Sequence, residues 1–150
     1  MGKIRIKTLF FFIATICLIL LCASPVLSDQ IIINSDDQFD FARSVMSDGD
    51  HTRAIVEFER FIHFFPGDSR VPRARLLIGM CYLKDRRYEK AREIFYPLIT
   101  AETDSPFSAK AVFLMGESYY QQGISKEAES YFVQVIEKYP DSDLKNAALY

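Results

Sequence analysis

The sequence predicts an all-α solenoid of stacked helix–turn–helix units that follows an N-terminal signal peptide. Two observations predict the fold. Residue types recur with a period of 37 residues, and each period holds two stretches with apolar residues at helical spacing. A third observation, a long apolar run behind basic residues at the N-terminus, predicts the signal peptide. With 49% hydrophobic and 25% charged residues over 150 positions, the composition is typical of a folded protein and excludes a disordered tail.

Residues 1–28 have the parts of a cleaved signal peptide: a basic start, a long apolar run and small residues before the cut. We predict cleavage between Ser28 and Asp29. Two alternatives stay open. The first is an uncleaved membrane anchor, because the apolar run is nearly long enough to cross a hydrocarbon core. The second is a lipoprotein acylated at Cys22. Each of the three places the rest of the chain beyond the cytoplasmic membrane of a bacterial host.

A period of 37 residues links residues of the same type along the rest of the chain. Each unit has an alanine followed four positions later by a phenylalanine: Ala54 and Phe58, Ala91 and Phe95, Ala128 and Phe132. The same step joins Gly79 to Gly116 and Tyr82 to Tyr119. Glycine inside a helix costs about 1 kcal/mol relative to alanine, so we expect each glycine to mark a close approach of the partner helix. We expect the alanines to lie opposite the glycines.

Each unit divides into two helical stretches that a polar turn separates. In the second unit we predict helices over 73–83 and 88–99 around a turn at 84–87. Proline cannot continue the helical hydrogen-bond ladder, so Pro66 and Pro140 are expected to end the second helices of their units. The turns share one position of the period, which is occupied by Gly49, Arg86 and Gly123.

These units resemble the tetratricopeptide repeat (TPR), which has a Leu-Gly pair, a Tyr three residues after the Gly, and later an Ala, a Phe and a Pro. The second and third units supply Ile78-Gly79 and Met115-Gly116 in that register, while the first, with Phe41-Ala42, is more degenerate. The leading Trp of the pattern is missing, and the period exceeds the usual length of about 34 residues. The unit endings Phe-Pro-Gly-Asp-Ser and Tyr-Pro-Asp-Ser behind an export signal are similar to two cell-envelope groups. These are the BamD-like outer-membrane assembly lipoproteins and the Tol-Pal cell-division coordinator.

The predicted organisation is a signal peptide at 1–28, an N-terminal tail at 29–37 and a TPR-like repeat domain at 38–150. The repeat domain holds three units and the start of a fourth, because another apolar stretch begins at residues 147–149. A solenoid needs a polar capping helix behind its last apolar face. We therefore expect the sequence to be a truncated part of a longer protein.

Residues that could carry chemistry are sparse. Neither of the two histidines, His51 and His63, has cysteine or carboxylate neighbours at metal-ligand spacing, and no phosphate-binding loop or nucleophile elbow occurs. His51 follows an acidic turn, where it either touches a cation or, as we favour, is solvated. Cys81, the only cysteine after residue 28, is predicted to be a buried core residue. We predict no catalytic residue, no metal and no cofactor.

Charge is distributed unevenly along the chain. Beyond residue 28 there are 15 basic and 20 acidic residues, and this acidic excess disfavours nucleic acid as a partner. The segment 70–92 carries eight basic and two acidic residues. Its arginines are interpreted either as a basic strip that docks an acidic segment or an anionic lipid, or as charges paired with neighbouring repeats. The strip consists of Arg70, Arg73, Arg75, Arg86, Arg87 and Arg92.

Stacked helix pairs leave a concave surface lined by the first helix of each unit, and the TPR resemblance implies that extended or helical peptides bind there. The Lys and Asn clamp with which chaperone-binding members of the family hold a terminal carboxylate is absent. For about half of the lining residues, plain packing between helices is the alternative. By the family register, the groove candidates are Phe39, Arg43, Met46, Leu76, Met80, Leu83, Phe113, Glu117 and Tyr120.

The expected function is that of a non-catalytic protein-interaction scaffold, exported to the periplasm or cell envelope and binding a protein or peptide partner. An uncleaved N-terminal segment would also hold it at a membrane. One alternative is a module that binds anionic lipid or cell-wall polymer through the arginines. Another is a targeting arm for an activity that lies beyond Tyr150.

Overall fold

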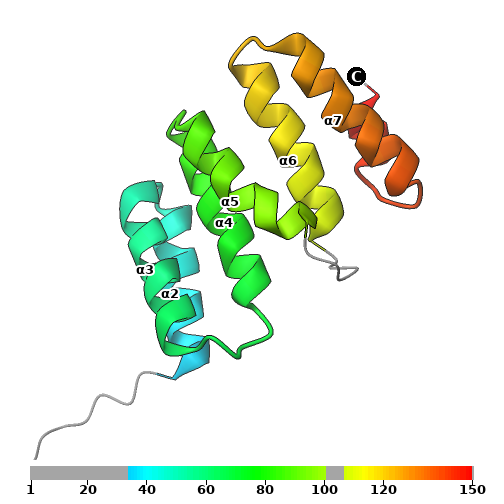
Figure 1. Ribbon diagram of the computed structural model, residues 1–150. Coiled ribbons are helices and arrows are strands. Elements are labelled where there is room, and N and C mark those ends of the chain that lie inside the picture. The colour runs from blue at the N-terminus through cyan, green and yellow to red at the C-terminus, as the bar shows by residue number, and fades with distance from the viewer. Residues whose placement is uncertain (1–33, 101–106, 150) are drawn as a thin grey trace, which may run out of the picture. The chain divides into compact units, whose positions relative to one another are not determined.

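The computed structural model describes residues 34–100 and 107–149, and all regular elements within these ranges are helices (Figure 1). The predicted signal peptide, with Ser28 and Asp29, lies outside the described residues. The seven described helices are α2 (Ser35–Ser47), α3 (His51–Phe64), α4 (Val71–Lys84), α5 (Tyr88–Thr100), α6 (Ser108–Gln121), α7 (Ser125–Lys138) and α8 (Lys145–Ala148). The all-α prediction is confirmed for this part of the chain.

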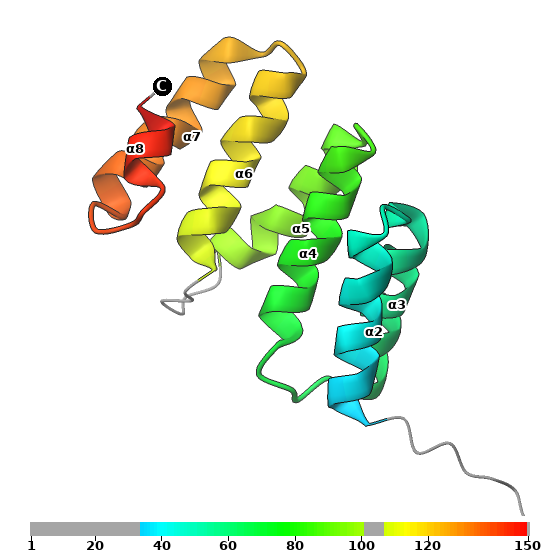
Figure 2. The same cartoon turned by 180° about the vertical axis from the view of Figure 1, so that it is seen from behind.

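The helices form hairpins that stack on one another. Helix α2 pairs with α3, α4 with α5, and α6 with α7, and α8 begins a fourth unit against α7. Each hairpin packs on the next through α3 against α4 and α5 against α6. Figure 2 shows the same stack from behind, with α8 in view. The second helices of the hairpins begin at His51, Tyr88 and Ser125, each 37 residues after the one before.

The core consists of clusters that each span one hairpin and the first helix of the next. Phe39 and Phe58 fill the first cluster together with Ile78 of α4. Phe95 fills the second together with Leu114 of α6. Because every cluster joins neighbouring units, the stability of the stack is a sum of local contacts, as is usual for solenoids.

Gly79 and Gly116 lie where the two helices of a hairpin approach most closely. A Cβ atom at Gly79 would overlap the ring of Phe95, and a Cβ atom at Gly116 would lie 2.8 Å from the ring of Phe132. The close approach that the glycines predict is therefore present. The partner differs from the prediction, because the phenylalanine ring of the period lies against the glycine where an alanine was expected. Ala91 is also fully buried, in the same cluster as Phe95.

The turn inside each hairpin contains one residue in the left-handed backbone conformation. The φ angle is 83° at Gly49 and Gly123, and 57° at Arg86. The backbone N–H of each of these residues donates to the carbonyl three residues earlier, over 2.9 to 3.1 Å. Since this conformation costs an L-residue about 1–2 kcal/mol, Arg86 is the strained member of the set.

Helix α2 begins earlier than the predicted end of the N-terminal tail. Its first residue is Ser35, so the boundary predicted at residue 38 falls inside the helix. The side chain of Asn34 caps the helix, because its Oδ1 accepts a hydrogen bond of 2.8 Å from the backbone N–H of Asp37. An aromatic residue, Phe39, then enters the core one turn later.

We expect Gly79→Ala to lower the free energy of unfolding by about 1–2 kcal/mol, because overpacking outweighs the gain in helix propensity. Urea denaturation followed by circular dichroism measures this change. In a Phe95→Leu background, which removes the ring, the penalty should disappear or reverse.

Gly67→Ala is the matched control, since a Cβ atom at Gly67 would meet nothing within 4 Å. This substitution should leave stability nearly unchanged. Stabilisation by Gly79→Ala in the wild-type background would contradict the close approach.

We expect Arg86→Gly to raise the free energy of unfolding by about 1 kcal/mol, because glycine adopts a positive φ without steric cost. The reverse substitution, Gly123→Arg, should lower it by a similar amount. Thermal and urea denaturation of both variants measure these effects, and a loss of stability in Arg86→Gly would refute the strain at this turn.

Candidate functional site

The nine predicted groove residues divide into core and surface. Phe39, Leu76 and Leu83 expose only 2, 6 and 5% of their surface, whereas Arg43 and Tyr120 are exposed. The other four are half-buried: Met46, Met80, Phe113 and Glu117. The members that a partner could reach therefore lie on α2 and α6, with Met80 alone on α4.

Packing within the first unit, and between the second and third units, explains the burial of the core members. The ring of Phe39 lies edge-on to the rings of Phe58 and Phe61, with centroid distances of 5.8 and 5.1 Å. Leu76 and Leu83 belong to the cluster that α6 closes from the next hairpin. Phe39 packs inside the first hairpin, whereas Leu76 and Leu83 hold the second repeat against the third, and all three present little surface to a ligand.

A first hollow lies between the first helices of the second and third hairpins. It has a volume of about 250 Å³. Met80 on α4 and Leu114 on α6 form its apolar part, and Lys84, Arg86 and Lys110 surround it with positive charge. It is lined in addition by Leu83, Glu117 and Gln121. Because the first helices of two hairpins, α4 and α6, contribute residues, this hollow lies on the surface where the sequence predicts a groove.

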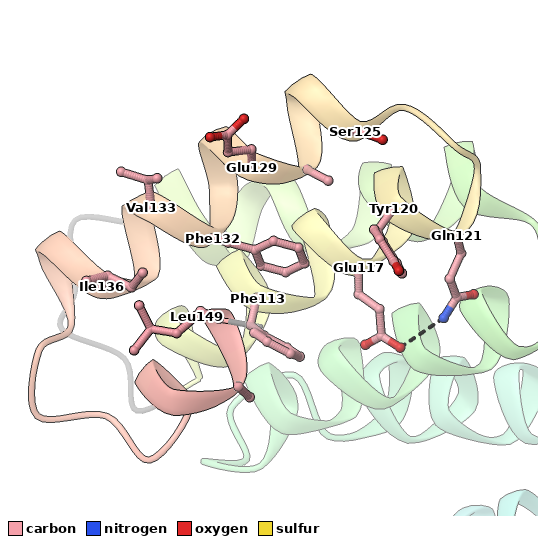
Figure 3. A pocket seen from close by; sticks show the side chains of 13 residues that line it. Phe113, Glu117, Tyr120, Gln121, Ser125, Glu129, Phe132, Val133, Ile136 and Leu149 are labelled. Carbon is pink, nitrogen blue, oxygen red and sulfur yellow. Dashed lines mark hydrogen bonds between the residues drawn. The ribbon is translucent and has the colours of Figure 1, made fainter.

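A second hollow of about 760 Å³ adjoins the first along α6, since Glu117 and Gln121 line both. Figure 3 shows Phe113 and Phe132 beside it, with ring centroids 5.5 Å apart. The amide Nε2 of Gln121 donates to the Glu117 carboxylate over 2.9 Å, which holds both side chains at the junction of the hollows. Ala148 and Leu149 border the hollow from the side of α8.

In the second hairpin, the helix faces equivalent to those around this hollow are more deeply buried than in the third. Leu76 and Phe95 occupy the positions of Phe113 and Phe132, and both are buried in the cluster that α6 completes. Phe113 and Phe132 are only half-buried. The described part of α8, Lys145–Ala148, covers less of this face than α6 covers of the preceding one.

The six arginines of the predicted basic strip lie at the two ends of α4, within α4 and on α5. Arg70 and Arg73 lie at the start of α4, and Arg86 and Arg87 follow its end. A 14-residue helix is about 21 Å long, so these two groups lie at opposite ends of α4. Arg75 is exposed on α4, and Arg92 is on α5. The structure therefore does not join them into one continuous strip.

Arg70 is engaged within the protein. Its guanidinium lies 2.8 Å from a carboxylate oxygen of Asp36 and 2.7 Å from one of Asp68. It also covers the ring of Phe39, 5.1 Å from the centroid, which adds a cation–π contact. The hydrogen bonds from Arg70 hold the pKa of the Asp68 carboxyl well below its usual range, and Asp68 in turn raises the pKa of Arg70.

Two other polar contacts join neighbouring helices. Nδ1 of His51 lies 2.8 Å from a carboxylate oxygen of Asp85, which links the turns of the first two hairpins. The buried Gln38 donates to the Glu57 carboxylate over 3.0 Å, and Arg60 lies 2.9 Å from the same carboxylate. Both contacts serve packing, and the favoured interpretation of His51 as a merely solvated side chain missed its partner.

Cys81 is fully buried, and burial raises the pKa of its thiol to about 11, so it is a core residue as predicted. Among the described residues, no group of three or more His, Cys, Asp or Glu side chains could hold a metal ion. Within the same ranges, no helix has the length and hydropathy needed to cross a membrane.

Sequence reasoning missed the apolar Leu114 and three polar residues of the first hollow: Lys84, Lys110 and Gln121. The repeat itself contained a signal for the polar residues. Lys110 stands one period after Arg73, and Gln121 one period after Lys84. Both pairs lie one helical turn away from predicted groove residues, so extending each face by a turn would have included them.

The tetratricopeptide-repeat family matches residues 39–101 and, separately, residues 110–142, which together make up more than half of the chain. No curated protein sequence matches this chain. The solved structure of MamA from Desulfovibrio magneticus RS-1 has a TM-score of 0.58 and 18% identity. That similarity covers 73% of this chain and 58% of the MamA chain, so this chain spans little more than half of that protein's length.

Two further structures show the same arrangement of helices. The N-terminal domain of stress-induced protein-1 from C. elegans has a TM-score of 0.62 at 14% identity, covering 76% of this chain and 91% of that one. The type III secretion translocator chaperone SycD from Yersinia enterocolitica has a TM-score of 0.58 at 18% identity, covering 80% and 89%. At such identities the similarity shows the fold alone. With both family matches, it establishes that the chain belongs to the tetratricopeptide-repeat proteins.

Proposed function

We propose that this protein is a non-catalytic interaction scaffold of the cell envelope, which holds a segment of a partner protein along α4 and α6. The observation that supports this function best is the pair of adjoining hollows that meet at Glu117 and Gln121. The TPR fold is a protein-binding scaffold, and stacked helix pairs present a preformed surface of this kind.

The chemistry of the first hollow indicates the kind of segment. Lys84, Arg86 and Lys110 supply positive charge around the apolar side chains of Met80 and Leu114. A partner segment with acidic residues flanking an apolar side chain would satisfy both parts. Such charge complementarity increases the rate of association and selects among partners.

Export and location in the envelope are part of the proposal. They are supported by the signal-peptide pattern of residues 1–28 and by the similarity of the unit endings to BamD-like lipoproteins and the Tol-Pal coordinator. Cleavage between Ser28 and Asp29 would release the repeats into the periplasm. Retention of the segment would keep them at the membrane.

Binding of anionic lipid or polymer through a basic strip has less support. Arg70 and Arg92 pair with acidic residues of the protein itself, and the two ends of α4 separate the others. A surface-binding module needs its charges on one face.

Site-specific photo-crosslinking in the native host tests the groove. A benzophenone side chain at position 110 should capture a partner, whereas the same probe at Lys126, which is exposed on α7, should not. Fractionation of the cells before crosslinking also tests the proposed location.

Charge reversal provides the second arm of this experiment. Lys84→Glu with Lys110→Glu should reduce capture by a crosslinker at position 121 by tenfold or more, while Lys90→Glu with Lys126→Glu leaves it unchanged. Circular dichroism checks that both double variants keep their helices. Equal capture from all variants would place the binding surface elsewhere.

A further inference from the structure

A third hollow, lined by α5, α6 and α7, shares no lining residue with the two hollows along the groove. Its volume is about 580 Å³, within the usual range for a small-molecule site. Its lining is unusually aromatic, with Tyr96 from α5, Tyr119 from α6 and Tyr131 from α7. The sequence places these tyrosines up to 35 positions apart, and only the packing of the hairpins gathers them.

The aromatic wall already holds one cation. The rings of Tyr119 and Tyr131 stack with centroids 5.6 Å apart and planes inclined by 10°. Cζ of Arg92 lies 4.3 Å from the centroid of Tyr119, a cation–π contact. Burial, followed by the neighbouring phenols of Tyr119 and Tyr96, raises the pKa of Tyr131, so this phenol keeps its proton at neutral pH.

The charge of Arg92 is balanced within the protein. Its guanidinium donates to Glu89 over 3.1 Å and to the side-chain oxygen of Gln122 over 2.9 Å. Gln122 closes the set, because its amide Nε2 donates to Glu89 over 2.9 Å. With these three side chains satisfying one another, Arg92 offers little to an anion.

One negative charge remains at the hollow. Glu93 is exposed and forms no ion pair with any described residue. Beside it on α5 stands Tyr96, 62% exposed and one turn further along the helix. Aromatic faces with a free carboxylate favour a cation, and they favour most a large, weakly hydrated one that loses little hydration on entering.

We propose that this hollow binds a small organic cation with a quaternary ammonium group of the choline type. The face of Tyr96 and the open side of the tyrosine stack contact the methyl groups, and Glu93 balances the charge. The site is separate from the groove and does not depend on the partner proposed to bind there.

Choline and its neutral isostere 3,3-dimethylbutan-1-ol provide the first test, with the full chain and detection by NMR of the tyrosine ring protons. The two probes have nearly the same shape, so their difference reports the charge alone. We expect choline to bind at least tenfold more tightly than the isostere and to shift the ring signals of Tyr96 and Tyr131. Equal binding of the two probes, or no binding of choline, would overturn the proposal.

Substitutions on the exposed side of the hollow provide the second test. Tyr96→Leu and Glu93→Gln should each weaken choline binding about fivefold or more, since each removes one contact of the cation. The matched controls are Tyr120→Leu and Glu129→Gln, exposed residues that line the second hollow. They should leave choline binding unchanged, and equal weakening by the controls would refute the site.

Vesicles provide the final arm. If the chain bound phosphatidylcholine vesicles without binding free choline, the surface would recognise a membrane, and the proposal of a solute site would be wrong. Circular dichroism of the four variants checks that their helical content is unchanged. The two control residues line the second hollow. Loss of partner capture in Tyr120→Leu alone would therefore concern the proposed groove and would not count against the cation site.

Discussion

The contact between a helical glycine and the phenylalanine ring of its partner helix is the constraint on which the rest of this structure depends. Gly79 and Gly116 leave no room for a Cβ atom, because the rings of Phe95 and Phe132 occupy that space. The ring fixes how closely the two helices of a hairpin approach. That distance in turn sets the face that each hairpin offers to the next, where Leu76 and Leu83 meet α6. Because the same contact recurs in successive repeats, the hairpin geometry recurs along the stack.

This arrangement uses the faces of each first helix unequally. In α4 and α6, one face packs on the partner helix and another on the neighbouring hairpin, while a third borders the first hollow. Met80 and Lys84 on α4, with Lys110 and Glu117 on α6, lie on that third face. A rigid surface of this kind binds without the cost of ordering a flexible loop, which favours a role in recognition.

The structure assigns partners to arginines of the basic segment 70–92 that the charge pattern of the sequence alone did not specify. Arg70 lies over Phe39 and pairs with acids from α2 and from its own turn. Arg92 lies over Tyr119 of the following hairpin and pairs with Glu89. Each joins one repeat to the next, which was the alternative interpretation of the basic segment. The side chains of Asp36 and Glu89 are 80% and 66% exposed, so salt screens these two ion pairs.

The sequence by itself determined the helical class, the hairpins and the turn position shared by Gly49, Arg86 and Gly123, because these depend on local spacing within the repeat period. It also predicted the burial of Cys81. Only the tertiary structure decided that Phe39 and Leu76 are core while Tyr120 is surface. Exposure depends on the hairpin that follows, and a repeat pattern does not specify how much of each face that hairpin covers. The same holds for the tyrosine hollow, whose residues come from three helices and meet only when the units are stacked.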